Sequence, residues 1–358
     1  MVNNKVIWFE VLTPKQAMLF LAIGKKFEKL GFMTIYTTRK HDYVLDIFDH
    51  LGVEPISLGE YGGKTLEGKL LASAKRVVKM AEQIIALENR PVASLASSSP
   101  DAARTAFGLG IPFIVFNDTP HSKPVARLTL SLVKYLITPS CIDPNDFISL
   151  GAHPESIHSY NGVDEVEYII PKYVEIKQSI IEQEDKVLIF RPEESFAAYM
   201  KDKDKKPYLE ILEKVVGSYK GKILVFPRYE AQKQSILDQF EKEIEIPDNG
   251  LHFKELLSQA EVMITGGGTM GREAALMGIP SITYFWRHLE PQLFLEQQGF
   301  PSFSVQDISE TKKLVEKICG NPSKYTVDTR KMITKLEKPS DILFRLMKKD
   351  IEFKNYFK

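Results

Sequence analysis

Only two of the 358 residues are cysteines, Cys141 and Cys319, and they lie in different halves of the chain. This scarcity argues against a disulfide framework and against a cysteine-based zinc site. No segment approaches the roughly 18 uninterrupted apolar residues that span a bilayer. The first residues, 1–5, lead into a strand-like segment without the apolar core of a secretory signal. Together these absences predict a cytoplasmic protein.

The chain also has no excess of either charge, with 47 basic and 47 acidic residues. Nucleic-acid binding needs clustered positive charge, so the composition does not favour a nucleic-acid partner. A local basic pocket for phosphates is compatible with a neutral total. Peripheral membrane contact also stays open, because one face of Val125–Leu136 is rich in leucine and carries Arg127 and Lys134.

The length exceeds what one hydrophobic core usually serves, and 44% of the residues are hydrophobic, which predicts two globular domains. Short apolar runs alternate with helix-length periodic segments throughout, the pattern of parallel sheets covered by helices on both faces. The expected strands are Val6–Phe9, Thr34–Thr37, Pro55–Ser57, Val92–Ala96, Phe113–Phe116, Tyr135–Thr138, Val187–Phe190, Ile223–Phe226, Val262–Thr265 and Ser281–Tyr284.

The predicted fold class is therefore α/β, with two Rossmann-like, doubly wound parallel-sheet domains that face a cleft. We expect an N-terminal domain over residues 1–165 and a C-terminal domain over residues 183–338, joined by a linker at Asn161–Glu184. Residues 339–358 read as a C-terminal helix that packs back on the N-terminal domain. The run Lys201–Lys206 contains an Asp-x-Asp pair, which some metal-dependent sugar transferases use, but a solvated loop is the simpler interpretation.

The most informative segment is the glycine-rich stretch that follows the strand Val262–Thr265. Gly266, Gly267 and Gly268 let the backbone approach a ligand, and Thr269 can cap a helix whose free amides attract a phosphate. Gly266, Gly268 and Gly271 also fit the dinucleotide pattern G-x-G-x-x-G. The residues after the next strand are Tyr284, Phe285 and Trp286, however, where a dinucleotide-binding domain would carry an acidic residue. NAD binding is therefore the weaker interpretation.

The run Thr269–Pro280 resembles the nucleotide-binding segment of GT-B glycosyltransferases and UDP-N-acetylglucosamine 2-epimerases. In that segment a glycine-rich turn precedes a helix that carries a glutamate, and Gly-x-Pro follows. The resemblance implies that Glu273 accepts hydrogen bonds from both ribose hydroxyls, a geometry that suits one carboxylate. The structural alternative is that Glu273 only complements the helix dipole from the first turn.

The whole chain is similar to the domain of unknown function 354 family, which is GT-B-like. The resemblance is carried by Leu12–Gln16, Ser99–Arg104, Asn117-Asp118 and Gly266–Ala275. It implies the fold more strongly than the reaction. It also implies a nucleotide-sugar, a UDP-sugar or a similar compound, as donor substrate and no separate cofactor.

Ligands of open parallel sheets lie beyond the carboxyl ends of the strands, which selects the remaining candidates. On the donor side, Arg191 and Arg228 suit a diphosphate leaving group, although Glu193, Glu194 or Glu230 can pair with them instead. Donor-sugar contacts are expected from His288, Glu290 and Gln292, of which His288 can equally be an ordinary loop residue.

On the acceptor side, Thr13 starts a helix at the cleft, and Asp118 and His121 are candidates for the catalytic base. By its position after a strand, Asp118 corresponds to an acidic residue that the epimerases use. Gly62-Gly63-Lys64 is either a loop that closes on phosphates or a plain surface turn.

These residues predict a hexosyltransferase-like, metal-independent glycosyltransferase, with no metal ligands assigned and a glycan or lipid-linked acceptor. A nucleotide-sugar epimerase or hydrolase and a non-catalytic nucleotide-sugar-binding protein are the alternatives. Phe190-Arg191-Pro192 lacks the histidine of the epimerases, and Pro124–Arg127 lacks their glutamates, which weakens the epimerase interpretation. A two-lobed periplasmic binding protein would need a signal segment.

Overall fold

The computed structural model describes residues 5–40, 44–63, 65–170, 173, 187–194, 206–247 and 253–357, the side chains of 253–255 excepted. Lys64 and the Asp-x-Asp pair of the loop Lys201–Lys206 lie outside these ranges. The chain divides into two compact units. Unit 1 comprises Met1–Tyr168 together with Glu337–Lys358, and unit 2 comprises Ile169–Leu336.

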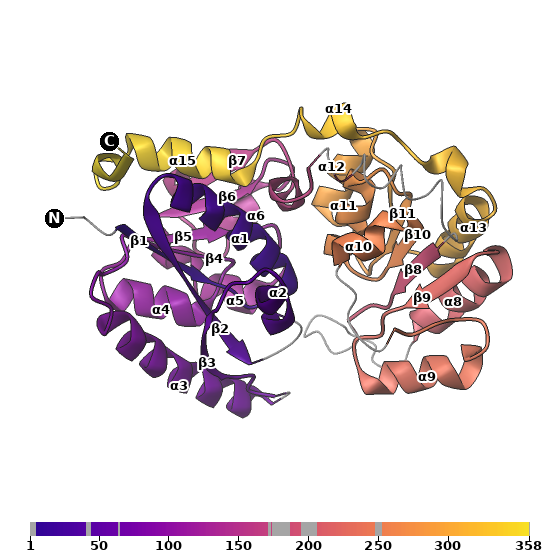
Figure 1. Cartoon of the computed structure of the whole chain (residues 1–358), viewed down its shortest axis with the longest axis horizontal. Coiled ribbons are helices and arrows are strands. Elements are labelled where there is room, and N and C mark those ends of the chain that lie inside the picture. The colour runs from indigo at the N-terminus through magenta and orange to yellow at the C-terminus, as the bar shows by residue number, and fades with distance from the viewer. Residues whose placement is uncertain are drawn as a thin grey trace. The chain divides into compact units, whose positions relative to one another are not determined.

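Unit 1 contains a seven-stranded sheet whose pairs are all parallel, in the order β3-β2-β1-β4-β5-β6-β7. Helices cover the sheet (Figure 1). The strands are β1 Lys5–Glu10, β2 Phe32–Lys40, β3 Ile56–Glu60, β4 Ala93–Ala96, β5 Phe113–Phe116, β6 Tyr135–Pro139 and β7 Ile157–Tyr160. The helices are α1 Pro14–Lys29, α2 Val44–His50, α3 Leu66–Ile85, α4 Pro100–Gly108, α5 Lys123–Arg127 and α6 Pro144–Ile148, with short 3₁₀ turns η1 Leu130–Leu132, η2 Pro154–Ser156 and η3 Asp164–Glu167.

The apolar pattern of the sequence explains how this unit is layered. β1 is buried from Val6 onward, because a central parallel strand is covered on both faces. Helix α1 begins after Thr13, whose hydroxyl accepts a hydrogen bond from the Gln16 amide, with Pro14 at the first helical position. The α1 face that packs on the sheet brings Phe20 against Phe9 and Phe116.

The C-terminal segment belongs to unit 1. Helix α15 (Pro339–Lys349) contacts β6, β7 and η3, and the turn η5 (Lys354–Phe357) packs against α15 (Figure 1). The Phe344 ring lies 4.8 Å from that of Phe27 on α1. At the start of α15, the Ser340 hydroxyl lies 3.0 Å from a Glu167 carboxylate oxygen, which also pairs with Lys26 at 2.6 Å.

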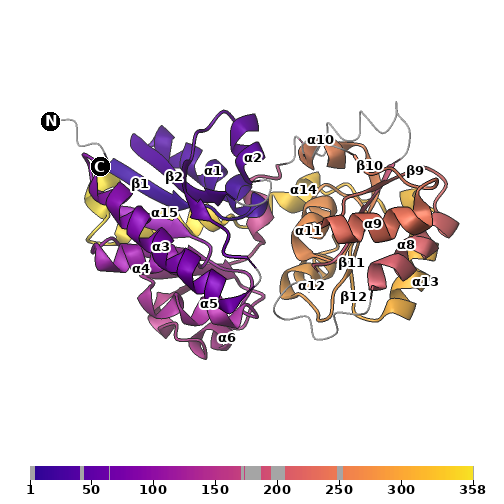
Figure 2. The same cartoon turned by 90° about the horizontal axis from the view of Figure 1, so that it is seen from below.

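Unit 2 contains a five-stranded parallel sheet in the order β12-β11-β10-β8-β9. The strands are β8 Val187–Arg191, β9 Lys222–Val225, β10 Ala260–Thr265, β11 Ser281–Tyr284 and β12 Ser302–Val305. The helices, seen from a second direction in Figure 2, are α8 Pro207–Ser218, α9 Glu230–Phe240, α10 Phe253–Ser258, α11 Gly268–Leu276, α12 Glu290–Gln297, α13 Ile308–Cys319 and α14 Arg330–Ile333, with the 3₁₀ turn η4 Pro322–Tyr325.

The fold class predicted from the sequence is confirmed, since both sheets are parallel and flanked by helices. Some details differ. The edge strands β7 and β12 were not expected. The first residues of the predicted linker form η3 within unit 1, where Asp164, Glu165 and Glu167 are buried. Within the described ranges, no helix has the length and apolarity to cross a membrane.

Candidate functional site

The strand order of unit 2 determines where its ligand site belongs. β8 is the first strand of the sheet, and its neighbours β9 and β10 lie on opposite sides of it. The crossover connections therefore diverge between β8 and β10, and open parallel sheets bind their ligands beyond the carboxyl ends of the strands at such a point. Arg191 ends β8, and the glycine turn follows β10. The glycine turn thus occupies the topological switch point.

Close packing requires glycine in this turn. The Gly266 amide donates to the Arg191 carbonyl at 2.9 Å, and a Cβ at Gly266 would lie 2.5 Å from the Glu193 Cα. The Gly267 amide donates to the Thr265 hydroxyl at 3.1 Å. Helix α11 starts at Gly268, and its N-cap is Gly267, with no side-chain capping bond. Thr269 therefore lies inside the helix, which corrects its predicted capping role, because Gly267 already has the extended backbone of an N-cap.

Two arginines flank the turn. Arg228 Nε donates to the Pro192 carbonyl at 3.0 Å, and its guanidinium would lie 3.1 Å from a Cβ at Gly267. Arg191 donates to the Phe226 carbonyl at 3.1 Å. Arg228 approaches Glu194 only to 4.0 Å. The structure thus brings Arg228 to the start of α11, where the helix dipole also attracts an anion.

Gln292 lies at the same place but is fully buried. Its side-chain nitrogen donates to the Gly268 carbonyl at 2.6 Å, and its oxygen accepts from Arg272 at 3.1 Å. Both ends of the amide are thus engaged within unit 2. Gln292 is placed to hold the glycine turn in position.

Glu273 is the sixth residue of α11 and is 3% exposed. The first turn of α11 holds no acidic residue. The alternative that Glu273 complements the helix dipole from the first turn is therefore wrong, because the helix begins before Thr269. Glu273 lies in the second turn of α11, the helix that starts at the switch point. The ribose contact that the resemblance implies for Glu273 stays a prediction.

The remaining donor-side candidates lie between β11 and α12. His288 is exposed, and Glu290 begins α12 and pairs with Arg287 at 2.5 Å. Among the described residues, no hydrogen bond or ion pair joins either side chain to the glycine turn. Their assignment to donor-sugar contacts stays a prediction.

Unit 1 has its own switch point, between β1 and β4, because β2 and β3 extend the sheet on one side and β5 to β7 on the other. Two helices begin there, capped by Thr13 and Ser99. Ser98, between β4 and α4, has φ of +50°, which no other described non-glycine residue shares in sign. A strained residue at such a position is common near functional sites. Its hydroxyl accepts from Asn117 at 2.7 Å.

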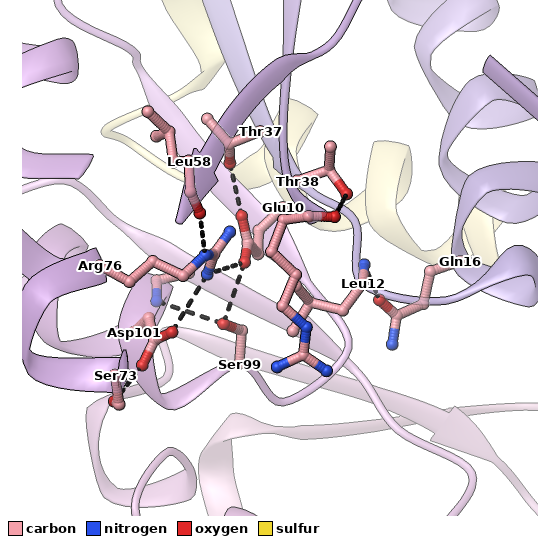
Figure 3. Close-up of polar contacts among 12 residues, drawn as sticks. Glu10, Leu12, Gln16, Thr37, Thr38, Leu58, Ser73, Arg76, Ser99 and Asp101 are labelled. Atoms are coloured by element: carbon pink, nitrogen blue, oxygen red, sulfur yellow. Dashed lines mark hydrogen bonds and ion pairs between the residues drawn. The ribbon is translucent and has the colours of Figure 1, made fainter. Parts of the chain in front are cut away.

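A buried ion-pair cluster lies beneath this switch point (Figure 3). Arg76, from α3, is 2% exposed and lies 2.5 Å from Glu10 and 3.1 Å from Asp101. Its Nε donates to the Leu58 carbonyl at 2.8 Å. The pKa of Arg76 is raised: burial lowers it, and the charges of Glu10 and Asp101 outweigh that effect. The cluster ties β1, β3, α3 and α4 together.

Asp118 follows β5 and belongs to a second cluster in unit 1. Lys15 Nζ lies 2.5 Å from Asp118, 2.7 Å from Asp164 and 3.7 Å from Glu165. The Tyr160 hydroxyl donates to Asp164. Burial raises the pKa of Asp164, an effect that Lys15 opposes and that Asp118 and Glu165 reinforce. Among the described residues, Lys15 thus lies within 4 Å of all three carboxylates, and the repulsion among them contributes to the raised pKa of Asp164.

His121 lies three residues after Asp118 and is half-buried. The sequence did not identify Lys15, Asp164 or Arg76 as site residues. The run Val163–Glu167 carries three acids in five residues, which reads as a solvated linker. Arg76 is one basic residue in a helix that also carries Lys69, Lys75 and Lys79. One feature of the sequence could have indicated that this run is buried: the apolar residues Val163 and Val166 lie among its acidic residues.

The two parallel sheets, each with polar groups at its switch point, define an α/β protein whose structural neighbours are GT-B-like. Methanocaldococcus jannaschii UDP-GlcNAc 2-epimerase in complex with UDP-GlcNAc and UDP is similar with a TM-score of 0.70 at 15% identity, over 96% of this chain and 100% of that chain. S. aureus MnaA with UDP gives 0.69 at 14% identity, over 96% of each chain. Anabaena Alr3699/HepE with UDP-glucose gives 0.64 at 13%, over 96% of this chain and 98% of that chain. At these identities the similarity shows the fold.

The family model described as Protein of unknown function (DUF354) matches residues 5–352. The chain belongs to this family, and the membership expected from the sequence is confirmed. It is also 27% identical to Uncharacterized protein MJ0665 of Methanocaldococcus jannaschii over 349 residues, which is 95% of this chain and 97% of that protein.

Proposed function

We propose that the chain binds a UDP-linked sugar at the switch point of unit 2 and transfers the sugar to an acceptor without a metal ion, as a GT-B-type glycosyltransferase. One observation carries the proposal: the glycine turn leads into an α11 N-terminus that has no side-chain cap, with Arg228 beside it. Residues 267–270 are half-buried, so this N-terminus is accessible from solvent.

The arrangement suits a diphosphate. The first amides of a helix lack intrahelical acceptors, and a phosphate can accept from them. Arg228, fixed through its Nε, presents its remaining donors to the same place. During transfer the nucleoside diphosphate leaves with added negative charge, which this combination stabilises. Glu273 would accept hydrogen bonds from the ribose hydroxyls, and Arg191, His288 and Glu290 are the further donor contacts.

On the acceptor side, an acceptor hydroxyl must lose a proton as the bond to the sugar forms. Asp118 is the first candidate for this base, because it follows β5 at the carboxyl edge of the sheet and its carboxylate lies 2.5 Å from the Lys15 ammonium. His121 is the second. Asp164 retains its proton to higher pH than an ordinary carboxyl and so complements Asp118 within the cluster.

The solved neighbours support the nucleotide part of the proposal, because their complexes contain UDP, UDP-GlcNAc or UDP-glucose. A nucleotide-sugar epimerase or hydrolase is the second candidate. It is supported by the fold that UDP-GlcNAc 2-epimerases share with this chain. Against it, Phe190-Arg191-Pro192 at the end of β8 lacks the histidine that the epimerases carry after this strand.

Thermal unfolding with UDP, UDP-GlcNAc and UDP-glucose tests the donor site. We expect at least one of them to raise Tm, and Glu273→Ala to lose most of that increase. Glu316→Ala, which changes an exposed glutamate on α13, is the matched control and should keep the increase. Full stabilisation of the Glu273→Ala variant would show that the ribose assignment is wrong.

The reaction is tested by following UDP release and sugar isomerisation with and without candidate acceptors, in the presence and absence of EDTA. A metal-independent glycosyltransferase releases UDP only when an acceptor is present, and EDTA leaves its rate unchanged. UDP release or an isomerised sugar without acceptor would establish the epimerase or hydrolase instead. Nucleotide binding without turnover would establish a binding protein.

A further inference from the structure

Unit 1 contains a pocket that none of the proposed steps uses. It has a volume of about 460 Å³ and lies between the carboxyl end of β2, strand β3 and residues 68–79 of α3. This volume is in the range of small-molecule sites. The lining residues are Lys40, Ser57, Gly59, Glu60, Tyr61, Gly68, Leu71, Ala72, Lys75 and Lys79.

The pocket is positively charged. Lys40, Lys75 and Lys79 line it together with a single carboxylate, Glu60, so its formal charge is positive in a chain of zero net charge. Across the ranges that the structure describes, none of these lysines has an ion pair or a side-chain hydrogen bond. Three ammonium groups around one hollow favour an anionic ligand, and the Ser57 hydroxyl adds a neutral donor.

Backbone packing gives the pocket its shape. Gly62 and Gly68 touch so closely that a Cβ on Gly62 would lie 2.5 Å from the Gly68 carbonyl oxygen. Gly59 has φ of +74° and rests on the stem of the buried Arg76. The predicted loop Gly62-Gly63-Lys64 is thus packed against the start of α3 at Gly62. The pocket wall is anchored to the buried cluster of Figure 3 through Arg76 and Leu58.

An exposed apolar strip lies next to the lysines on the same helix. Leu71 and Val78 are 59% and 57% exposed, and they are seven residues apart, two helical turns. Lys75 and Lys79 follow Leu71 by four and eight residues, so all four side chains share one face of α3. Lysine side chains beside apolar groups can keep their charge at a polar boundary while their stems cover apolar surface.

We propose that this pocket and strip bind a lipid phosphate, with the phosphate among Lys40, Lys75 and Lys79 and the hydrocarbon chain along Leu71 and Val78. In the context of the proposed glycosyltransferase, on which this part of the inference rests, the acceptor is then a lipid that carries a phosphate or diphosphate. A second copy of the chain would cover the apolar strip but would leave the lysine-lined hollow unmatched. The charge therefore favours the anionic lipid.

Calorimetric titration with dodecyl phosphate below its micelle concentration tests the inference, with inorganic phosphate and dodecyl maltoside as separate arms. We expect dodecyl phosphate to bind more tightly than either. Lys75→Gln/Lys79→Gln should weaken it about thirty-fold, from the charge that two lysines lose near an anionic group. Leu71→Gln/Val78→Gln should weaken it about tenfold through lost apolar contact.

The matched controls are Lys348→Gln/Lys349→Gln and Ile351→Gln, which change exposed residues near the C-terminus and should bind as the wild type does. Pelleting with phosphatidylcholine vesicles, with and without phosphatidic acid, extends the test to a bilayer. Co-sedimentation that needs phosphatidic acid and is lost in Lys75→Gln/Lys79→Gln supports the lipid assignment.

Four results would overturn the inference. Inorganic phosphate that binds as tightly as dodecyl phosphate would indicate a free-phosphate site. Dodecyl maltoside that binds as tightly as dodecyl phosphate would show that the phosphate is not recognised. Unchanged dodecyl phosphate binding in both double variants would show that it binds outside this pocket and strip. A dimer that Leu71→Gln/Val78→Gln dissociates, without any amphiphile binding, would assign the strip to a second copy. UDP stabilisation measured on the same variants reports separately on the donor site, so either proposal can fail alone.

Discussion

Arg76 shows how one side chain can control the stability of an entire sheet edge. It is enclosed by Glu10, Asp101 and the Leu58 carbonyl, which come from three different elements. Removing one partner of a buried ion pair leaves uncompensated charge in a poorly solvated place. The Arg76 guanidinium therefore contributes far more to the stability of unit 1 than an exposed arginine would.

We expect Arg76→Met to lower the free energy of unfolding of unit 1 by about 3–5 kcal/mol. Urea unfolding can be followed by Trp8 fluorescence in a Trp286→Phe background, because the chain has two tryptophans and Trp8 is the one in unit 1. Adding Glu10→Gln to Arg76→Met should recover part of the loss. A loss no larger than that of the exposed Arg345→Met would contradict the buried-charge explanation.

His158 gives unit 1 a defined response to acid. Burial lowers its pKa from the ordinary 6.5, and its Nε2 is buried without a hydrogen bond in the described structure. Below pH 6.5 His158 binds a proton in the unfolded chain, but it stays neutral in the folded chain until the pH approaches its lowered pKa. The stability of unit 1 therefore falls as pH drops from about 6.5 towards the lowered pKa of the folded state.

We expect His158→Phe to remove this part of the acid destabilisation while keeping the edge-on contact with Tyr135. The measurement is the urea midpoint of unit 1 between pH 5 and pH 8, conditions on either side of the ordinary histidine pKa. Near pH 8, where this histidine is neutral in the folded and unfolded chains, the urea midpoints of the two proteins should change with pH by similar amounts. An identical pH dependence in the variant would show that other groups control the acid response.

Helix α11 packs closely against the sheet at Gly271. A Cβ on Gly271 would collide with the Thr283 hydroxyl and lie 3.0 Å from the Ser281 hydroxyl, both on β11. The helix therefore reaches β11 only because residue 271 is glycine. Moving α11 outward would also move its N-terminus away from Arg228.

Gly271→Ala should consequently lower Tm and weaken UDP binding together, despite alanine's better helix propensity. Gly217→Ala is the control, because Gly217 lies in α8 with open space around it and should be neutral or slightly stabilising. Thermal unfolding with and without UDP measures both effects. Normal UDP affinity in a destabilised Gly271→Ala protein would show that UDP binding does not depend on how closely α11 packs against β11.

Central strands could be predicted from the sequence more accurately than edge strands. Buried central strands such as Phe113–Phe116 are apolar throughout and were predicted with correct bounds. The edge strands β7 and β12 mix apolar and polar residues over four positions, a pattern too short to distinguish from a loop. The Thr13 cap is local and was predicted correctly, whereas the Arg76 and Lys15 clusters depend on partners far away in the sequence.

At the scale of the whole molecule, unit 2 is inserted into unit 1. The chain leaves unit 1 after Tyr168 and returns at Glu337. The returning segment buries Ile342, Leu343, Met347 and Phe353. At roughly 1.5–3 kcal/mol per buried apolar side chain, this segment contributes as much as a typical domain's net stability.

A chain that stops after Leu336 should therefore fail to fold unit 1, with an exposed apolar surface and little soluble protein. The milder Leu343→Ala should fold with unit 1 destabilised by about 2–5 kcal/mol. Soluble yield and circular dichroism of the truncated chain, and urea unfolding of Leu343→Ala, provide the measurements. A truncated chain with native Trp8 fluorescence would show that α15 is dispensable.

The insertion also orders events during protein synthesis. Unit 2 is one continuous stretch, so a ribosome can release all of it before the last residues of unit 1 exist. The first half of the chain must then wait, with its face for α15 uncovered, until translation reaches residues 337–358. A nascent chain of this protein should therefore recruit chaperones to its earliest-made part for longest, an inversion of the usual N-to-C order of maturation.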